Sequence, residues 1–219
     1  MLIIYADGAC SGNPGPAGSA IVLVRDVNGR QESVGSQERS IGHGTNQVAE
    51  LVAAHMAIEC AIEQPETAIT IRCDSEYVVK GVNEWMAGWL RNGWRNASKK
   101  PVANQEHWMA INEALDKARG QHGKTLTFAW VRGHSVDRFN NQVDELAVAA
   151  SRMKPSAVRN SVAAAPAASA PTSLRDQITA AVRGLCDGTI HDDPAQWNLT
   201  CSGEDVIALV ERFSGKARI

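Results

Sequence analysis

Two short apolar runs, LIIYAD at residues 2–7 and AITIRCD at residues 68–74, each end on an acidic residue. Their β-branched composition is typical of strands. Because the ligands of open sheets gather where parallel strands end, the two runs predict an α/β fold in which Asp7 and Asp74 face one crevice. Taken singly, either acid is better explained as the start of a turn or of a helix.

Further β-type and helical patterns alternate along the chain on both sides of these runs. Asn28 and Gly29 form a typical hairpin turn, and Thr45 or Asn46 can cap a helix that ends before Pro65. The remaining elements are predicted as strands at residues 19–25, 31–37 and 126–131 and helices at residues 75–90, 105–119 and 143–153. A hairpin followed by alternating helices and strands predicts a mixed sheet covered by helices.

The composition is that of a globular protein in a reducing compartment. The 219 residues carry a net charge of −2 and include five cysteines without a C-x-x-C pair. This pattern disfavours a disulfide framework and a structural zinc, and the sequence has neither an export signal nor a membrane-spanning run. We therefore expect a soluble, cytoplasmic protein with no membrane partner, in which a nucleic acid would be held by a local basic patch.

Two further acids strengthen the expectation that carboxylates gather in one functional site. Glu50 lies within an apolar helical stripe, where an unpaired charge is costly, and Asp144 is predicted at the start of the last helix, where the helix dipole alone could explain it. A cluster of these two with Asp7 and Asp74 would repel itself unless it held divalent cations, and oxygen ligands favour Mg²⁺ or Mn²⁺. His134, in the loop VRGHSVDRF, could move a proton there, although a lone loop histidine is more often only surface.

The chain resembles the type 1 ribonuclease H family, of which bacterial ribonuclease HI is a member, over residues 1–153. The motifs that carry the resemblance are DGACSGNPGPAG, GTNQVAELVAA, CDSEYVVKGV and WVRGH with VDELA, in that order. The resemblance implies a ribonuclease H-like fold with a five-stranded mixed sheet flanked by helices. It also implies an endonuclease that hydrolyses the RNA strand of RNA/DNA hybrids with two Mg²⁺ ions, for which Mn²⁺ can substitute, leaving 3′-hydroxyl and 5′-phosphate ends.

Position by position, the resemblance also implies roles for individual residues. His134 matches a mobile histidine that assists turnover, and the remaining matches fall into two groups. The metal-binding carboxylates are Asp7, Glu50, Asp74 and Asp144, and the contacts to the hybrid backbone are Asn13, Thr45, Asn46 and Gln47. The sequence departs from the family pattern at Glu76, at Asn141 and in the loop HSVDRFNN. These departures concern loop dynamics and rate rather than the core chemistry.

A basic segment rich in tryptophan follows the third predicted strand. It resembles the family's basic handle, which tracks the DNA strand, and its cations can neutralise phosphates. Its substrate-contact candidates are Trp85, Trp89, Arg91, Trp94, Arg95, Lys99 and Lys100. Trp85 and Trp89 share one helix face, which predicts that at least one of them is a core residue, whereas Trp94 and the cations are harder to bury.

The C-terminal third changes character after the predicted catalytic domain, residues 1–154. Residues 155–173 are almost all Ala, Pro, Ser and Val and predict a linker. Residues 174–219 carry two helical patterns, which predict a small helical module that docks on the catalytic domain, binds a protein partner or self-associates. An extension without a core of its own is an equal alternative, and the catalytic domain is expected to be monomeric.

Two other functions remain open from the residues alone. The first is a hybrid-binding module without catalysis, which the presence of all four acids disfavours. The second is an endonuclease of the same fold that acts on DNA junctions. The tryptophan-containing handle and the asparagines that match backbone contacts disfavour this alternative.

Overall fold

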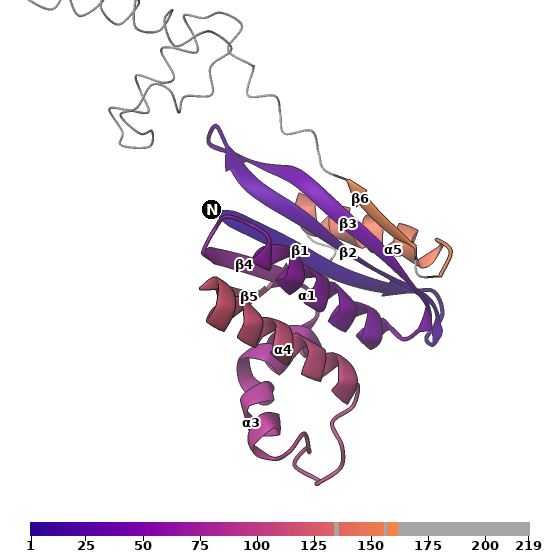
Figure 1. Cartoon of the computed structure of the whole chain (residues 1–219). Coiled ribbons are helices and arrows are strands. Elements are labelled where there is room, and N and C mark those ends of the chain that lie inside the picture. Colours follow the sequence, from indigo (N-terminus) through magenta and orange to yellow (C-terminus); the bar gives the residue numbers. More distant parts are fainter. Residues whose placement is uncertain (134–135, 156, 162–219) are drawn as a thin grey trace, which may run out of the picture. The chain divides into compact units, whose positions relative to one another are not determined.

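The computed structural model describes residues 1–133, 136–155 and 157–161 (Figure 1). A mixed sheet with the strand order β5-β4-β1-β2-β3-β6 forms its centre. The strands are β1 Leu2–Cys10, β2 Gly15–Val27, β3 Arg30–Gly44, β4 Ala68–Cys73, β5 Thr125–Trp130 and β6 Val158–Ser161. The predicted mixed sheet is therefore confirmed, but it has six strands rather than five.

The extra strand, β6, lies inside the segment predicted as a linker. It pairs antiparallel with β3, from Ser36 opposite Ser161 to Arg39 opposite Val158. Its sequence, VRNS, has only one apolar residue and lacks the alternation that identifies most strands, so pairing with an open sheet edge determines its conformation. The two helical patterns predicted within residues 174–219 lie outside the described residues.

Pairing directions in the sheet bring the two acid-terminated strands side by side. β1 pairs antiparallel with β2 and parallel with β4, and β4 pairs parallel with β5. The hairpin between β2 and β3 turns at Asn28 and Gly29, which both have positive φ, as a two-residue turn of this kind requires. The predicted hairpin is confirmed, and β1 and β4 end at the same edge of the sheet.

Helices cover both faces of the sheet (Figure 1). The helices are α1 Asn46–Ile62, α2 Glu76–Lys80, a π-helical turn η1 Gly81–Trp85, α3 Met86–Arg91, α4 Gln105–His122 and α5 Arg138–Ser151. Leu2, Ile4 and Ala6 pack with α1 and α4 in one core, while Ile3 and Tyr5 pack with α5 in the other. This alternation along β1 follows from the two-residue period of a strand.

At two glycines, the backbone of a strand lies directly against the backbone of a helix that carries candidate site residues. A Cβ on Gly8 would lie 2.3 Å from the backbone nitrogen of Glu50, so only glycine lets β1 touch the first turns of α1 there. A Cβ on Gly18 would lie 2.3 Å from the backbone nitrogen of Ser151 in α5. Ser19 Oγ also donates to the Ala49 carbonyl at 2.6 Å. The glycines of the first motif therefore position α1 and α5 against the sheet.

The last helix begins five residues earlier than its sequence pattern predicts. Asp137 caps α5 by accepting hydrogen bonds from the backbone N–H groups of Phe139 and Asn140. Asp144 therefore lies in the second turn of α5 and not at its start, so the helix dipole does not explain the acid. Within the described residues, no helix is both long and apolar enough to cross a membrane.

Candidate active site

Asp7 is the most enclosed of the four candidate acids. It lies near the end of β1 with 8% of its surface exposed, and the backbone N–H of Gly8 donates to its Oδ1 at 2.7 Å. Burial, together with the nearby charges of Asp74, Asp144 and Glu50, raises the pKa of Asp7 from 3.8 to about 8. The structure thus brings all four candidate acids into one electrostatic environment.

Glu50 belongs to α1, and two side chains hold its carboxylate. Asn46 Nδ2 donates to Oε1 at 2.7 Å, and Ser75 Oγ donates to Oε2 at 2.6 Å. Burial raises the pKa of Glu50, the hydrogen bond from Ser75 opposes this rise, and the charge of Asp74 adds to it. Since Ser75 also caps α2, one hydroxyl group links the acid of α1 to the end of β4.

Asp74 follows β4 and is contacted from two further segments. Trp130 Nε1 donates to the Asp74 backbone carbonyl at 2.9 Å, and Asn140 Nδ2 donates to Asp74 Oδ2 at 3.4 Å. A Cβ on Gly133 would lie 2.7 Å from the same Oδ2, so the chain after β5 passes directly over this carboxylate. Asp144 is half-buried and lies one helical turn beyond Asn140 on the same side of α5.

Asn140 is a candidate site residue that sequence reasoning missed. It is 1% exposed, and its Oδ1 has no hydrogen-bond partner among the described residues. Ser75 was also missed, although its place directly after Asp74 is a typical N-cap signal. Asn140 could have been found from its spacing of four residues before Asp144, but only after the start of α5 had been placed correctly.

The donor set fits hard divalent cations. Across residues 1–133, 136–155 and 157–161, no three His, Cys, Asp or Glu side chains stand close enough together to enclose a metal ion. The four acids nevertheless interact electrostatically, and both oxygens of Glu50 accept hydrogen bonds. Carboxylate oxygens are the ligands that Mg²⁺ and Mn²⁺ prefer, and a cation would relieve the repulsion that raises the pKa of Asp7.

The four polar residues expected to contact the hybrid backbone lie at the first turn of α1. Asn13 is exposed between β1 and β2, and its Oδ1 accepts from the Asn46 backbone N–H at 3.3 Å. Thr45 caps α1 through the backbone N–H of Val48, as predicted. Gln47 is exposed and accepts a hydrogen bond from Asn104 at 3.5 Å. This polar strip continues directly into the site, because Asn46 also binds Glu50.

α3 and the loop after it project away from the sheet (Figure 1). The four cations of this protrusion, Arg91, Arg95, Lys99 and Lys100, are all exposed. Trp85 is 37% exposed, and Trp89 packs against the buried Trp108 with ring centroids 5.2 Å apart. The prediction that at least one of Trp85 and Trp89 is a core residue is therefore supported. Trp94 corrects our expectation, because it is half-buried against the same core.

His134 lies outside the described residues, so its predicted place beside the acids stays a prediction. The neighbouring Gly133 is described and touches Asp74. The loop that carries His134 therefore begins at the site.

Comparison with known proteins agrees with this architecture. The RNase H family model matches residues 1–152. Ribonuclease H of Ruegeria pomeroyi is 46% identical over 158 residues, which are 70% of this chain and 93% of that protein. Ribonuclease H of Roseobacter denitrificans is 43% identical over 146 residues, which are 67% of this chain and 92% of that protein.

A solved structure supports the same assignment. The RNase H domain of prototype foamy virus superposes with a TM-score of 0.57 at 27% identity, over 68% of this chain and 93% of that domain. The family match covers all four acids and the protrusion. The chain therefore belongs to the ribonuclease H family of hydrolases.

Proposed function

We propose that this protein is an endonuclease that hydrolyses the RNA strand of RNA/DNA hybrids with two divalent cations, leaving 3′-hydroxyl and 5′-phosphate ends. The observation that carries the proposal is the chain of contacts that joins the four acids from four segments. Gly8, next to Asp7, presses on the backbone of Glu50. Ser75, next to Asp74, donates to Glu50, and Asn140, one turn before Asp144, donates to Asp74.

The acids would hold the cations, with Asp7 as the buried central ligand and Glu50, Asp74 and Asp144 around it. Two bound Mg²⁺ ions would supply an activated water and stabilise the leaving oxygen of an in-line displacement. Asn46 and Ser75 orient Glu50, and Asn140 orients Asp74. His134 would carry a proton away from the site or to the leaving group during turnover.

The substrate would lie across the first turn of α1 and the protrusion. Asn13, Asn46 and Gln47 are polar groups of the kind that read 2′-hydroxyls in a shallow minor groove. The exposed cations after α3 would neutralise phosphates of the DNA strand, and the exposed part of Trp85 would pack on a sugar or base. Hybrids present both a ribose strand and a deoxyribose strand, which suits this division of the surface.

A substrate panel tests the proposal. The full chain is incubated with end-labelled RNA/DNA hybrid, RNA duplex, DNA duplex and a DNA four-way junction, with Mg²⁺ or with EDTA. We expect cleavage of the hybrid RNA strand alone, only with Mg²⁺, and none from Asp74→Asn. Hybrid binding without cleavage would instead identify a binding module, and cleavage of the junction without a ribose requirement would identify a DNA endonuclease.

A second step identifies the products. Ligation of the cleaved RNA to a donor that carries a 5′-phosphate requires a free 3′-hydroxyl, and removal of the 5′-phosphate by phosphatase shifts the mobility of the downstream fragment. Fragments that end in a 2′,3′-cyclic phosphate would contradict a metal-activated water, because they arise from attack by the neighbouring 2′-hydroxyl.

A further inference from the structure

A hydrogen-bond network joins β1 and β4 close to the ends at which their acids lie. Tyr5 and Arg72 are partners in the parallel register, two residues before Asp7 and Asp74 respectively. Because side chains alternate along a strand, Tyr5 lies on the same face of β1 as Asp7. Arg72 Nη1 donates to Tyr5 Oη at 2.8 Å, and the Tyr5 hydroxyl donates to Asp137 Oδ2 at 3.0 Å.

Asp137 uses its two carboxylate oxygens for different elements. Oδ1 accepts the backbone N–H groups of Phe139 and Asn140 at 3.0 and 3.3 Å and so caps α5. Oδ2 accepts the Tyr5 hydroxyl and lies 3.8 Å from Arg72 Nη1. One carboxylate therefore ties the first turn of α5 to two neighbouring strands.

The network is held tightly by its surroundings. Tyr5 is 1% exposed, and its ring packs on Phe139 with centroids 5.7 Å apart. The Arg72 guanidinium lies 5.6 Å from the centroid of the same tyrosine ring. Charge-assisted hydrogen bonds in a half-buried setting are stronger and more directional than neutral ones, so this arrangement leaves α5 little freedom to slide or rotate.

The first two turns of α5 carry the residues of the helix that belong to the site. Asn140 lies three residues after Asp137 and donates to Asp74, and Asp144 lies seven residues after Asp137. The spacing of three and seven residues places all three side chains along one side of the helix. Any shift of the cap is therefore transmitted directly to Asn140 and Asp144.

We propose that Tyr5, Arg72 and Asp137 form a positioning clamp that fixes the first turn of α5 and holds the Asn140 amide on Asp74. The inference rests on the proposed function, because the clamp matters for rate only if Asp74 and Asp144 act together. The three clamp residues act through Asn140 and Asp144 rather than on the substrate, so they are positioning residues.

Two variants of the full chain separate the clamp from helix capping and packing. Tyr5→Phe removes one hydroxyl and keeps the ring on Phe139. Asp137→Ser keeps a capping oxygen but loses the second oxygen that Tyr5 binds. Since small misplacements of catalytic groups lower the rate of the chemical step strongly, we expect kcat for the hybrid to fall about tenfold in each variant. KM should change less than about twofold, because the first turn of α1 and the protrusion are untouched.

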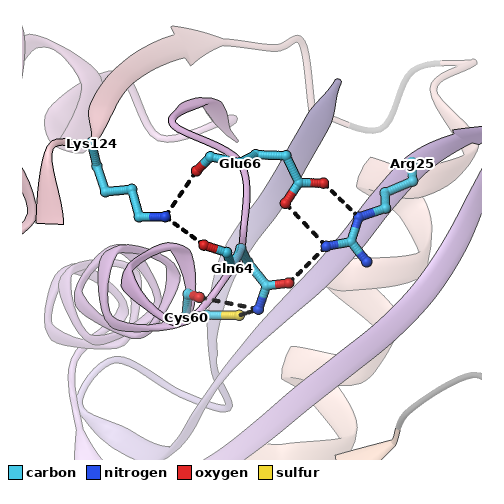
Figure 2. Close-up of polar contacts among 5 residues, drawn as sticks. All are labelled: Arg25, Cys60, Gln64, Glu66 and Lys124. Atoms are coloured by element: carbon cyan, nitrogen blue, oxygen red, sulfur yellow. Dashed lines mark hydrogen bonds and ion pairs between the residues drawn. The ribbon is translucent and has the colours of Figure 1, made fainter. Parts of the chain in front are cut away.

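A matched control comes from a second arginine network, shown in Figure 2. Arg25 Nε donates to Glu66 at 2.8 Å and its Nη2 donates to Gln64 at 2.8 Å. Arg25 pairs with Leu2 on β1, five residues or about 17 Å along the strand from Asp7. Glu66→Gln weakens this network, so it should lower stability as the clamp variants do while leaving kcat within about twofold of wild type.

A readout that does not depend on activity completes the test. Amide hydrogen exchange at Asn140 and Asn141 should become at least about tenfold faster in both clamp variants and stay unchanged in Glu66→Gln. Because Tyr5 and Asp137 act as one unit, the double variant should be no slower in kcat than Asp137→Ser alone.

The outcomes separate the clamp from the proposed function. Clamp variants that lose only stability, with kcat and exchange as in Glu66→Gln, would overturn the clamp. A wild-type chain that binds hybrid but never cleaves it would overturn the proposed function, and the exchange rates alone would then decide the clamp.

Discussion

Asp7 is a carboxyl group in a place where both burial and neighbouring charge oppose its ionisation. It is 8% exposed, and three other acids contribute to raising its pKa to about 8. Such a residue destabilises the metal-free protein at neutral pH, which is the usual sign of a group retained for chemistry rather than for stability.

The raised pKa of Asp7 predicts how stability depends on pH. The folded protein holds this proton up to about pH 8, whereas the unfolded chain releases it near pH 4. Between these values the folded state binds more protons, so the free energy of unfolding of the metal-free protein should fall as the pH rises. Thermal unfolding in EDTA from pH 4 to pH 8 measures this slope.

Asp7→Asn isolates the contribution of this one residue. The variant keeps the shape of the side chain and should flatten the pH dependence. At pH 8 its melting temperature should exceed that of wild type by several degrees, at about 2–4 °C per kcal/mol for a domain of this size. Stability curves that run parallel for both proteins would show that Asp7 is ionised in the folded state throughout.

His134→Ala should lower kcat more than it changes KM, because a residue that moves a proton acts after the hybrid is bound. We expect a loss of about 10², the low end for general acid–base catalysis, since water can substitute. Steady-state kinetics at saturating Mg²⁺ measure both constants, and His122→Ala, at the exposed end of α4, is the control. A change confined to KM would instead make His134 a binding residue.

At the scale of elements, the tryptophans of the protrusion pack on the core and its cations are exposed to solvent. Trp89 and Trp94 pack on the core, while Arg91, Arg95, Lys99 and Lys100 all face solvent. Arg95 Nη1 also donates to the Lys99 carbonyl at 2.8 Å, which holds two of the cationic positions next to each other. The tryptophans therefore anchor the protrusion on the core, and the cations remain exposed, where we propose that they contact phosphates.

Neutralising those four cations to glutamine should weaken hybrid binding and flatten its dependence on salt. Each lost phosphate contact should reduce the slope of log K against log salt by about 0.9, while cleavage at saturating substrate should persist. Binding titrations from low to high salt measure the slope.

The control for this prediction changes charge elsewhere. Lys99→Gln with Lys100→Gln is compared with Lys117→Gln and Arg119→Gln, which remove the same charge from exposed positions of α4. Only the first pair should change the slope. Equal slopes for both pairs would mean that binding responds to net charge and not to the protrusion.

Local sequence patterns predicted some elements well and others poorly, for identifiable reasons. The strand at Ala68–Cys73 and the hairpin at Asn28 and Gly29 were predicted because their signals are contained in a few residues. The start of α5 was missed because the predicted helix was begun at the apolar Val143, although Asp137 is a local N-cap for the turn before it. Asn140 was missed with it, since its role follows from where the helix begins.

The acids of the site were predicted, but the groups that orient them were not. Asp7 and Asp74 stand out as acids at strand ends, and Glu50 stands out as a charge in an apolar stripe. Asp144 was expected at a helix start and was included because four acids together need a common explanation. Their supporting hydrogen bonds join segments that are distant in sequence, such as Ser75 with Glu50. Single-sequence patterns carry no information on such pairs.

At the scale of the whole molecule, β6 continues the sheet beyond residue 154, the predicted end of the catalytic domain. Val158–Ser161 closes the edge of β3, and Arg159 Nη1 lies 3.2 Å from Glu38 Oε2. Glu38 is 2% exposed, so its carboxylate depends on Arg159 for a partner. A boundary at residue 154 therefore removes both the strand that pairs with β3 and the cation that pairs with Glu38.

Two truncations test this boundary. The chain of residues 1–161 should keep the melting temperature of its domain, and the chain of residues 1–154 should be less stable by about 1–3 kcal/mol, because it loses the hydrogen bonds of β6 and the ion pair of Arg159 with Glu38. Both should cleave hybrid at low temperature, because the four acids, His134 and the protrusion all precede residue 154. Calorimetry and hybrid cleavage measure the two effects.

Sedimentation of the same proteins addresses the predicted C-terminal module. We propose that residues 174–219 act outside the catalytic unit, so a full chain that sediments as a larger species than residues 1–161, with equal cleavage, would indicate self-association through this segment. Loss of cleavage by residues 1–161 would contradict its separation from catalysis. Residues 1–154 alone should associate further, because an open β3 edge pairs with other strands.

Arg159→Ala in the full chain separates the ion pair from the strand. If the buried charge dominates, this variant should lose most of the stability that residues 1–154 lose, while its β3 edge stays covered and its sedimentation stays that of wild type. If strand pairing dominates, Arg159→Ala should be nearly neutral, because the backbone hydrogen bonds of β6 do not depend on the side chain. Equal melting of residues 1–154 and 1–161 would show that β6 adds no stability and would support the predicted domain boundary at residue 154.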